Sequence, residues 1–380
     1  MASNAKPTNA QRVHSELGQS LWYDNLQRGL LDSGAFQALL DAGVRGCTSN
    51  PTIFDKAITG SKDYEAELAN LALDGKSAEE IYYALVTRDI QRAADLLRPV
   101  YDESQAKDGY VSLEVQPKNS SDADATIAEG SELSRRIGRP NLMIKVPATE
   151  PGLPAIRELI GRGISVNVTL VFAIDQYRQV ANAYIDGLER AATAGKDLSQ
   201  ISSVASFFVS RLDSAIDPRL KKLGSAEAQA LLGKAAIANA RRAYQAYQQI
   251  FSSPRFQALA ARGATPQRVL WASTGTKDPS YKDTVYVDEL IGPDTVNTVP
   301  PATLAAFQDH GSVARTVDQG VAAADKVIRD LAALGIDVDV VCNELLSGGV
   351  ESFNQSMNSL LKGIADRRQA VLRERGKAAE

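Results

Sequence analysis

The sequence Asn141-Leu142-Met143-Ile144-Lys145-Val146-Pro147-Ala148-Thr149 contains one charged side chain within an apolar run. The run predicts a short buried strand that ends near the proline. Burial of a lysine favours its neutral amine, which can form a Schiff base with a carbonyl substrate. Lys145 is therefore a candidate catalytic residue. The alternative is a lysine on an edge strand, where a charge discourages aggregation.

Length and composition exclude several classes of protein. The chain has 380 residues and a formal net charge of -4. This length allows one large α/β barrel or two ordinary domains. The mild acidity indicates neither a nucleic-acid partner nor a membrane surface, and no apolar run is long enough to cross a membrane.

Few residues are available to bind a metal ion. The chain has two histidines and two cysteines, and Cys47 and Cys342 have no spacing typical of a metal site or a disulfide framework. We therefore expect no metal. The first nine residues are small and polar and include no apolar signal segment. We expect a protein of the reducing cytoplasm.

Short apolar strands alternate with amphipathic helical patterns on both sides of Lys145. We expect strands at residues 21–26, 46–50, 110–116, 142–146, 164–170, 204–208, 269–273 and 295–299. Helical patterns lie at residues 33–40, 78–97, 122–137, 175–194, 225–250 and 255–261. This alternation predicts a closed (β/α)8 TIM barrel over about residues 20–310. A doubly wound open sheet is the alternative, although no GxGxxG motif follows a strand.

The C-terminal region is also expected to be helical. Residues 313–334 and 349–372 have helical patterns and would pack outside or across the barrel. We therefore expect one domain over residues 1–380, with C-terminal helices at about residues 311–375.

Polar side chains recur near the C-terminal ends of the first five predicted strands. They are Asp24, Asn50, Glu114, Lys145, Asn167 and Thr169. Alternation along a strand places such side chains inside the barrel, and barrel active sites lie at this end of the strands. Unpaired buried charges are costly, so a catalytic site is the economical interpretation. The alternative is a buried ion-pair network without function.

Four segments resemble the signature segments of transaldolases, which are class I Schiff-base aldolases. These segments are 46–54 (GCTSNPTIF), 142–149 (LMIKVPAT) followed by Gly152-Leu153, 166–172 (VNVTLVF) and 206–213 (SFFVSRLD). The length of the chain is similar to that of the longer bacterial transaldolases.

The resemblance implies a catalytic role for four residues. Lys145 would attack the carbonyl carbon of a ketose. Asp24 would move the proton of the substrate hydroxyl when the carbon–carbon bond breaks. Glu114 and Thr169 would hold the water used in imine formation and hydrolysis. The protonated imine accepts the electrons, so the resemblance implies neither a metal nor an organic cofactor.

The resemblance also implies substrate-binding residues. Asn50 and Asn167 would orient the dihydroxyacetone unit, and Ser206 and Arg211 would bind the phosphate end. The shorter members of the family place an arginine after strand seven. Lys277 is the plausible substitute here, as a point charge rather than a fork.

The implied reaction is that of the pentose phosphate pathway. A dihydroxyacetone unit would pass from sedoheptulose 7-phosphate to glyceraldehyde 3-phosphate, giving erythrose 4-phosphate and fructose 6-phosphate. The partners would be sugar phosphates, and the protein would be a monomer or a homodimer.

Two other functions remain open. Fructose-6-phosphate aldolase-like relatives carry a tyrosine three residues before the phosphate-binding arginine. Phe208 stands there and favours the transferase. A catalytically silent sugar-phosphate-binding barrel would be expected to lack the lysine or a carboxylate, and this chain has both.

Overall fold

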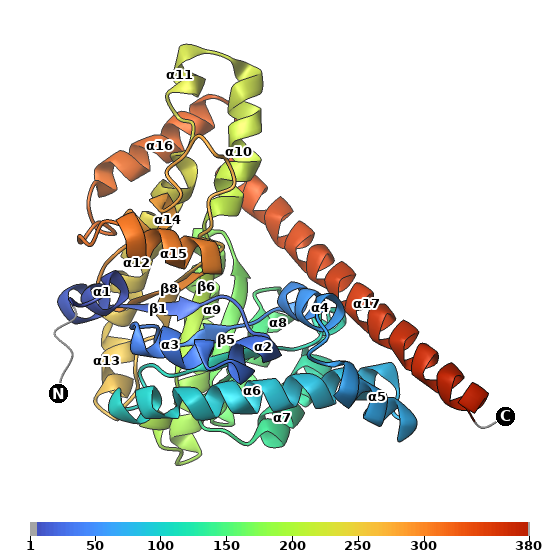
Figure 1. Cartoon of the computed structure of the whole chain (residues 1–380). Coiled ribbons are helices and arrows are strands. Elements are labelled where there is room, and N and C mark those ends of the chain that lie inside the picture. The colour runs from blue at the N-terminus through green and yellow to red at the C-terminus, as the bar shows by residue number, and fades with distance from the viewer. Residues whose placement is uncertain (1–5, 379–380) are drawn as a thin grey trace.

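A closed barrel of eight parallel strands forms the centre of the molecule (Figure 1). The computed structural model describes residues 6–378. The strands are β1 (Gln19–Tyr23), β2 (Cys47–Thr48), β3 (Val111–Glu114), β4 (Leu142–Pro147), β5 (Val166–Val171), β6 (Ser203–Phe208), β7 (Arg268–Ala272) and β8 (Thr295–Val299). They follow one another around the barrel, and β8 pairs with β1. The predicted (β/α)8 barrel is confirmed.

Helices cover the outside of the barrel (Figure 1). They are α1 (Asn9–Leu17), α2 (Arg28–Asp32), α3 (Ala35–Asp41), α4 (Pro51–Gly60), α5 (Glu65–Leu73), α6 (Ala78–Glu103), α7 (Ala123–Ile137), α8 (Gly152–Gly161), α9 (Ile174–Thr193), α10 (Ser210–Leu223), α11 (Ala226–Gln229), α12 (Ala235–Phe251), α13 (Pro254–Ala260), α14 (Val285–Asp288), α15 (Pro301–His310), α16 (Val321–Ala333) and α17 (Val338–Ala378). Short 3-10 turns lie at Pro117–Asn119 and Leu198–Gln200.

The first two strands end earlier than the apolar pattern predicts. β1 ends at Tyr23, and the backbone N–H of Asp24 still donates to the Val299 carbonyl at 2.9 Å before the chain leaves the barrel. β2 ends at Thr48, because Asn50 caps α4 by accepting the N–H of Ile53 at 2.9 Å. Both polar residues therefore lie just beyond their strands, at the rim of the barrel.

The C-terminal region differs from the prediction at two points. Residues 313–320 are not helical. Instead, the N–H groups of Thr316 and Val317 donate to the Ile291 carbonyl, and Val317 is buried. α17 begins at Val338, not at residue 349, and continues through Gly348 and Gly349 as one helix of 41 residues.

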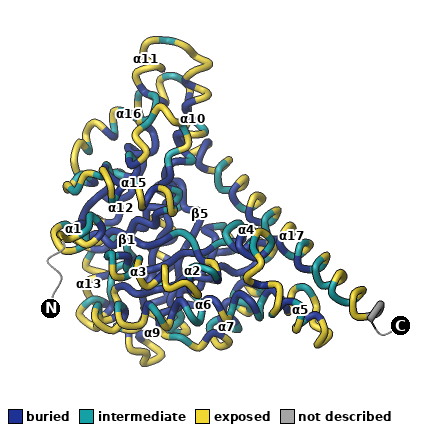
Figure 2. The backbone as a smooth tube through the Cα atoms, in the orientation of Figure 1, coloured by how far each residue is buried: buried dark blue, intermediate teal, exposed yellow. Residues whose placement is uncertain are grey.

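Buried side chains form a continuous core from the barrel to α17 (Figure 2). Trp22 of β1 belongs to it, and so do Phe353, Met357, Leu360 and Ile364 of α17. From this continuity we propose that residues 6–378 form a single domain. The predicted bounds of 1–380 include five residues at the start and two at the end that lie outside the described range. In the described range no helix is both long and apolar enough to cross a membrane.

Candidate active site

Lys145 lies in the middle of β4 with its amine inside the barrel. The side chain is buried, and its Nζ donates to the Ser49 carbonyl at 3.2 Å. Nζ also lies 3.3 Å from Oε2 of Glu114. Strand register places Glu114 of β3 and Asn167 of β5 directly beside Lys145. A closed barrel has no edge strand, so the edge-strand interpretation of Lys145 is wrong.

Glu114 and Thr169 have polar atoms that remain available for a reaction. Both carboxylate oxygens of Glu114 and the Oγ1 of Thr169 are buried without a hydrogen-bond partner among the described residues. Most buried polar atoms in proteins have such a partner. Burial raises the pKa of Glu114, although Lys145 and Arg211 act in the opposite direction. These atoms can therefore accept or hold a proton, a water or a substrate hydroxyl.

Asp24 provides a second carboxylate with different surroundings. Its Oδ1 accepts a hydrogen bond of 2.6 Å from the Thr48 hydroxyl, which also contacts the Thr298 hydroxyl at 2.5 Å. Burial raises the pKa of Asp24, and the charge of Lys145 is the largest opposing effect. A carboxylate whose pKa is moved towards neutrality is suited to general acid–base catalysis.

Asn167 joins the interior of three strands by hydrogen bonds. Its Nδ2 donates to the Ser112 hydroxyl at 3.0 Å, and its Oδ1 accepts from the Ser206 hydroxyl at 2.7 Å. All three side chains are buried. The amide of Asn167 is thereby fixed beside Lys145, in an orientation set by its neighbours on β3 and β6.

A cavity of about 270 Å³ opens above Lys145 at the C-terminal ends of the strands. Seven of the predicted site residues line it: Asp24, Asn50, Lys145, Ser206, Phe208, Arg211 and Lys277. The other three predicted residues, Glu114, Asn167 and Thr169, do not line the cavity and lie on the strands that flank β4. The structure therefore brings together residues that are up to 253 positions apart, from Asp24 to Lys277.

Positive charge dominates the mouth of this cavity. Arg211, in the first turn of α10, makes no ion pair with the residues that the structure describes. Its guanidinium carbon lies 5.1 Å from the centre of the Phe208 ring. Lys277 and Lys56 also line the cavity. Besides Lys145, the cavity is lined by three cationic side chains and by one carboxylate, that of Asp24. This excess of positive charge suits an anionic substrate.

An irregularity in β5 shapes the wall beside Thr169. The pairing register shifts between Val168 and Val171, and Leu170 has a φ of 59°. The Gln176 side chain accepts from the Phe172 N–H at 2.8 Å and donates to the Leu170 carbonyl at 3.1 Å. Backbone strain of this kind persists only where neighbouring groups hold it, and it often lies at functional sites.

Ten of the lining residues are absent from the predicted site, and Lys56 and Phe353 are two of them. Lys56 is on α4, the helix that the Asn50 motif begins, so its nearness to the site could have been inferred from the motif. Phe353 is on α17, and its ring centre lies 5.8 Å from Nζ of Lys145. No local pattern in the sequence indicates this contact, because it depends on the path of α17 over the barrel.

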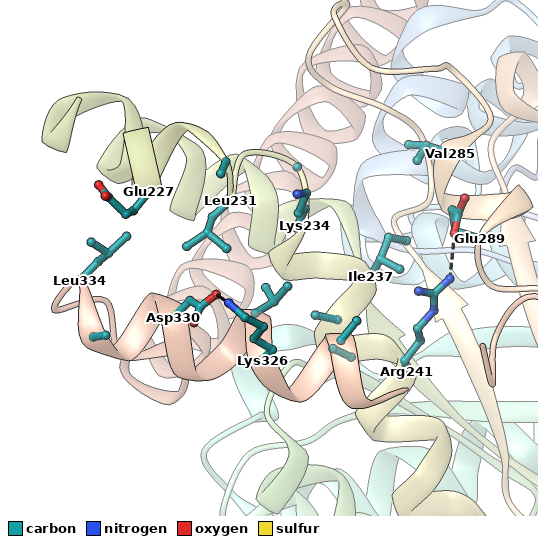
Figure 3. Close-up of a pocket in the computed structure, with 17 residues that line it drawn as sticks. Glu227, Leu231, Lys234, Ile237, Arg241, Val285, Glu289, Lys326, Asp330 and Leu334 are labelled. Atoms are coloured by element: carbon teal, nitrogen blue, oxygen red, sulfur yellow. Dashed lines mark hydrogen bonds and ion pairs between the residues drawn. The ribbon is translucent and has the colours of Figure 1, made fainter. Parts of the chain in front are cut away.

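A larger cavity lies away from the barrel mouth. It has a volume of about 860 Å³ and lies among α12, α14 and α16 (Figure 3). Four of its charged side chains are paired, Arg241 with Glu289 at 2.8 Å and Lys326 with Asp330 at 2.6 Å. None of the predicted site residues lines it. The smaller cavity above Lys145 is therefore the candidate active site.

The described residues offer no obvious metal site. No group of three or more histidine, cysteine, aspartate or glutamate side chains is placed to hold a metal ion in the part of the chain that the structure describes. Cys47 and Cys342 are both buried free thiols, and burial raises the pKa of each. Neither thiol is therefore a reactive thiolate.

Comparison with known proteins agrees with the geometry. The sequence profile of the family described as Transaldolase/Fructose-6-phosphate aldolase matches residues 21–364. The chain belongs to this family. This match confirms the family predicted from the signature segments.

Relatives within the transaldolase family cover almost the whole chain. Transaldolase 1 of Streptomyces avermitilis is 51% identical over 359 residues, which are 94% of this chain and 95% of the relative. Transaldolase of Frankia alni is 50% identical over 92% of this chain and 95% of its own. Transaldolase 2 of Nostoc punctiforme is 48% identical over 93% and 96%. The family match extends to residue 364 and so includes Phe353 of α17.

Proposed function

We propose that this protein is a transaldolase that acts through a Schiff base on Lys145. It transfers a dihydroxyacetone unit from sedoheptulose 7-phosphate to glyceraldehyde 3-phosphate and forms erythrose 4-phosphate and fructose 6-phosphate. The observation that carries the proposal is the buried amine of Lys145, 3.3 Å from the Glu114 carboxylate and beneath a cationic cavity mouth. A nucleophilic amine, a nearby carboxylate and an anion-binding mouth are the groups that this reaction needs.

Imine formation requires Lys145 to lose a proton. Glu114 is placed to accept it, because its Oε2 lies 3.3 Å from Nζ and burial raises its pKa. The neutral amine then attacks the ketose carbonyl carbon, a C–N bond forms, and water leaves from the carbinolamine. Glu114 and Thr169 supply the buried polar atoms that can hold this water.

Carbon–carbon cleavage requires a second base. Asp24 removes the proton from the hydroxyl of the carbon that becomes the aldehyde. The electrons of the broken bond move into the iminium group on Lys145 and give an enamine. Because Asp24 follows β1, Glu114 ends β3 and the two have different neighbours, the two proton transfers can be separated. The enamine then attacks the acceptor aldehyde, and Asp24 returns its proton to the new hydroxyl.

Phosphate binding is proposed for the cationic mouth. Arg211 offers a planar fork of donors that suits a phosphate group, and Lys277 adds a second positive charge. Ser206 and Asn50 line the same cavity and orient the chain of the substrate between these cations and Lys145. Binding at this distance from the reacting carbon helps to align it.

Phe208 separates transfer from simple cleavage. Its ring packs 5.2 Å from the Phe172 ring, and the Arg211 guanidinium lies over its face. A phenyl ring cannot position a water or relay a proton to the enamine carbon. We therefore propose that the protein is a transferase. The competing possibility is an aldolase that releases free dihydroxyacetone.

We propose that the protein acts in the cytoplasm. The two cysteines of the described residues are buried free thiols, which suits a reducing compartment. The proposed chemistry requires neither a metal nor an organic cofactor, because the iminium on Lys145 accepts the electrons of the broken bond.

A coupled assay tests the proposed function. Purified protein is mixed with sedoheptulose 7-phosphate, with and without glyceraldehyde 3-phosphate, and erythrose 4-phosphate, fructose 6-phosphate and free dihydroxyacetone are measured. We expect fast erythrose 4-phosphate formation only when the acceptor is present. Equal cleavage in its absence, with release of dihydroxyacetone, would identify an aldolase instead. Lys145→Ala is the control without the nucleophile.

A further inference from the structure

α17 runs from beside α10, past α4, towards α5 (Figure 1), and its Phe353 lines the cavity above Lys145. Near its start, Glu344 pairs with Arg219 of α10. In its middle, the Ser356 hydroxyl lies 2.8 Å from the Thr52 hydroxyl of α4. Towards its end, Arg367 donates to the carbonyls of the last turn of α4. The helix is therefore held at both sides of the cavity above Lys145.

A close contact with Leu170 of β5 limits how near the backbone of α17 lies to the barrel. Gly349 is buried, and a Cβ atom there would lie 2.9 Å from Cδ2 of Leu170. The same Cβ would lie 3.5 Å from a terminal nitrogen of Arg211. Glycine therefore allows the helix backbone to approach the strained residue of β5. Phe353, one helical turn later, is brought into the cavity by this approach.

Phe353 contacts the two groups that bind opposite ends of the proposed substrate. Its ring centre lies 5.8 Å from Nζ of Lys145 and 6.0 Å from the guanidinium carbon of Arg211. The side chain is only 4% exposed and lines the cavity. An apolar ring that lines the cavity near both groups occupies space that water would otherwise fill.

We propose that Phe353 of α17 shields the Lys145 imine from water and thereby favours transfer over hydrolysis. This inference rests on the proposed Schiff-base function. The competing hydrolysis begins with protonation of the enamine carbon, which gives the iminium of dihydroxyacetone. Water then adds at its C2, and cleavage of the C–N bond frees dihydroxyacetone and the Lys145 amine. Apolar bulk at position 353 excludes the water that this reaction consumes.

The test measures the ratio of hydrolysis to transfer. Wild type, Phe353→Ala and Phe353→Leu are given fructose 6-phosphate with and without erythrose 4-phosphate, and free dihydroxyacetone and sedoheptulose 7-phosphate are measured. We expect Phe353→Ala to raise the ratio at least about tenfold, because the water that hydrolysis consumes can then reach the imine. Phe353→Leu keeps apolar bulk and should stay within about twofold of wild type.

Met357→Ala is the matched control. Met357 is also 4% exposed, lies one turn further along α17, and does not line the cavity. Borohydride trapping of the imine verifies that each variant forms the intermediate. A ratio for Phe353→Ala equal to that of Met357→Ala would overturn the inference. If Phe353→Ala does not fold, Phe353→Val takes its place in the same comparison.

The wild-type enzyme separates the two proposals. If it forms no imine and transfers no dihydroxyacetone unit, the proposed function itself fails before any variant is compared. If it does both and the ratio is insensitive to residue 353, only the role of Phe353 is overturned.

Discussion

The two carboxylates of the site, Glu114 and Asp24, differ in their hydrogen-bond partners. Glu114 lies beside the ammonium of Lys145 and has no hydrogen-bond partner among the described residues, whereas Asp24 accepts a short hydrogen bond from Thr48. These surroundings assign imine chemistry to Glu114 and carbon–carbon cleavage to Asp24 in the proposed mechanism. The two carboxylates can be tested separately.

Asp24→Asn should lower kcat by about 10²–10⁴-fold, because a positioned general base commonly contributes that much. Imine trapping should persist, since Asp24 is not needed to form the C–N bond. Burial raises the pKa of Asp24, and its ionised form is the base. The acid limb of the wild-type kcat/KM profile should therefore lie at a higher pH than for an ordinary aspartate.

Thr48→Val gives a second test of the pKa of Asp24. The Thr48 hydrogen bond lowers the pKa of Asp24, so its removal should move the acid limb to still higher pH. A profile that does not move, in a variant that still forms the imine, would contradict the assignment of Asp24 as the base.

Arg211→Ala should raise KM for phosphorylated substrates by about 10- to 100-fold, since a hydrogen-bonded charged pair contributes about 1.5–3 kcal/mol. Lys277 is exposed, so Lys277→Ala should have a smaller effect, below about fivefold. Glyceraldehyde without a phosphate is the control acceptor, and its KM should change little in either variant. An equal change for both acceptors would place the phosphate elsewhere.

Phe208→Tyr should increase the release of free dihydroxyacetone from fructose 6-phosphate without an acceptor, and lower transfer. The added hydroxyl could hold a water or relay a proton, and even a small part of the usual 10²–10⁴-fold effect would be measurable. Cleavage is measured in wild type and variant at equal imine-trapping yield. Equal rates would show that residue 208 does not control this partition.

Secondary-structure elements were predictable where the local pattern decides them. The apolar run around Lys145 predicted β4, and the alternation of residues 166–171 predicted β5 with Asn167 and Thr169 inside the barrel. The path of α17 was not predictable, because Gly348-Gly349 is typical of a helix boundary. In the structure the helix continues through this glycine pair. The close approach of Gly349 to Leu170 then brings Phe353 to the site.

Alanine substitutions at these two glycines of α17 should have opposite effects on the stability of the protein. A Cβ at exposed Gly348 would meet open space, so Gly348→Ala should stabilise the protein by up to about 1 kcal/mol through helix propensity. Gly349→Ala should destabilise it by about 1–3 kcal/mol, because the Leu170 side chain must move, while the new Cβ only comes into van der Waals contact with Arg211. It should also raise KM for phosphorylated substrates. Urea unfolding and steady-state kinetics of both variants measure these effects, and a stabilising Gly349→Ala would contradict the close contact.

At the scale of the whole molecule, the barrel gathers residues that the sequence spreads widely. The repeated strand–helix pattern predicts the barrel, and the barrel places residues at the C-terminal ends of β1, β2, β4, β6, β7 and β8 around one cavity. Seven of the predicted site residues meet there for this reason. Contacts between the barrel and α17 have no such repeating pattern, which is why the sequence did not indicate Phe353.

The proposed mechanism requires Lys145 to carry the covalent intermediate. Borohydride added to the protein with fructose 6-phosphate should reduce the imine and leave one dihydroxyacetone-sized adduct. Peptide mass spectrometry should locate this adduct on Lys145, and Lys145→Ala and Lys145→Arg should give none, because a guanidinium stays protonated. An adduct on another lysine, or none on the active wild-type protein, would contradict the account.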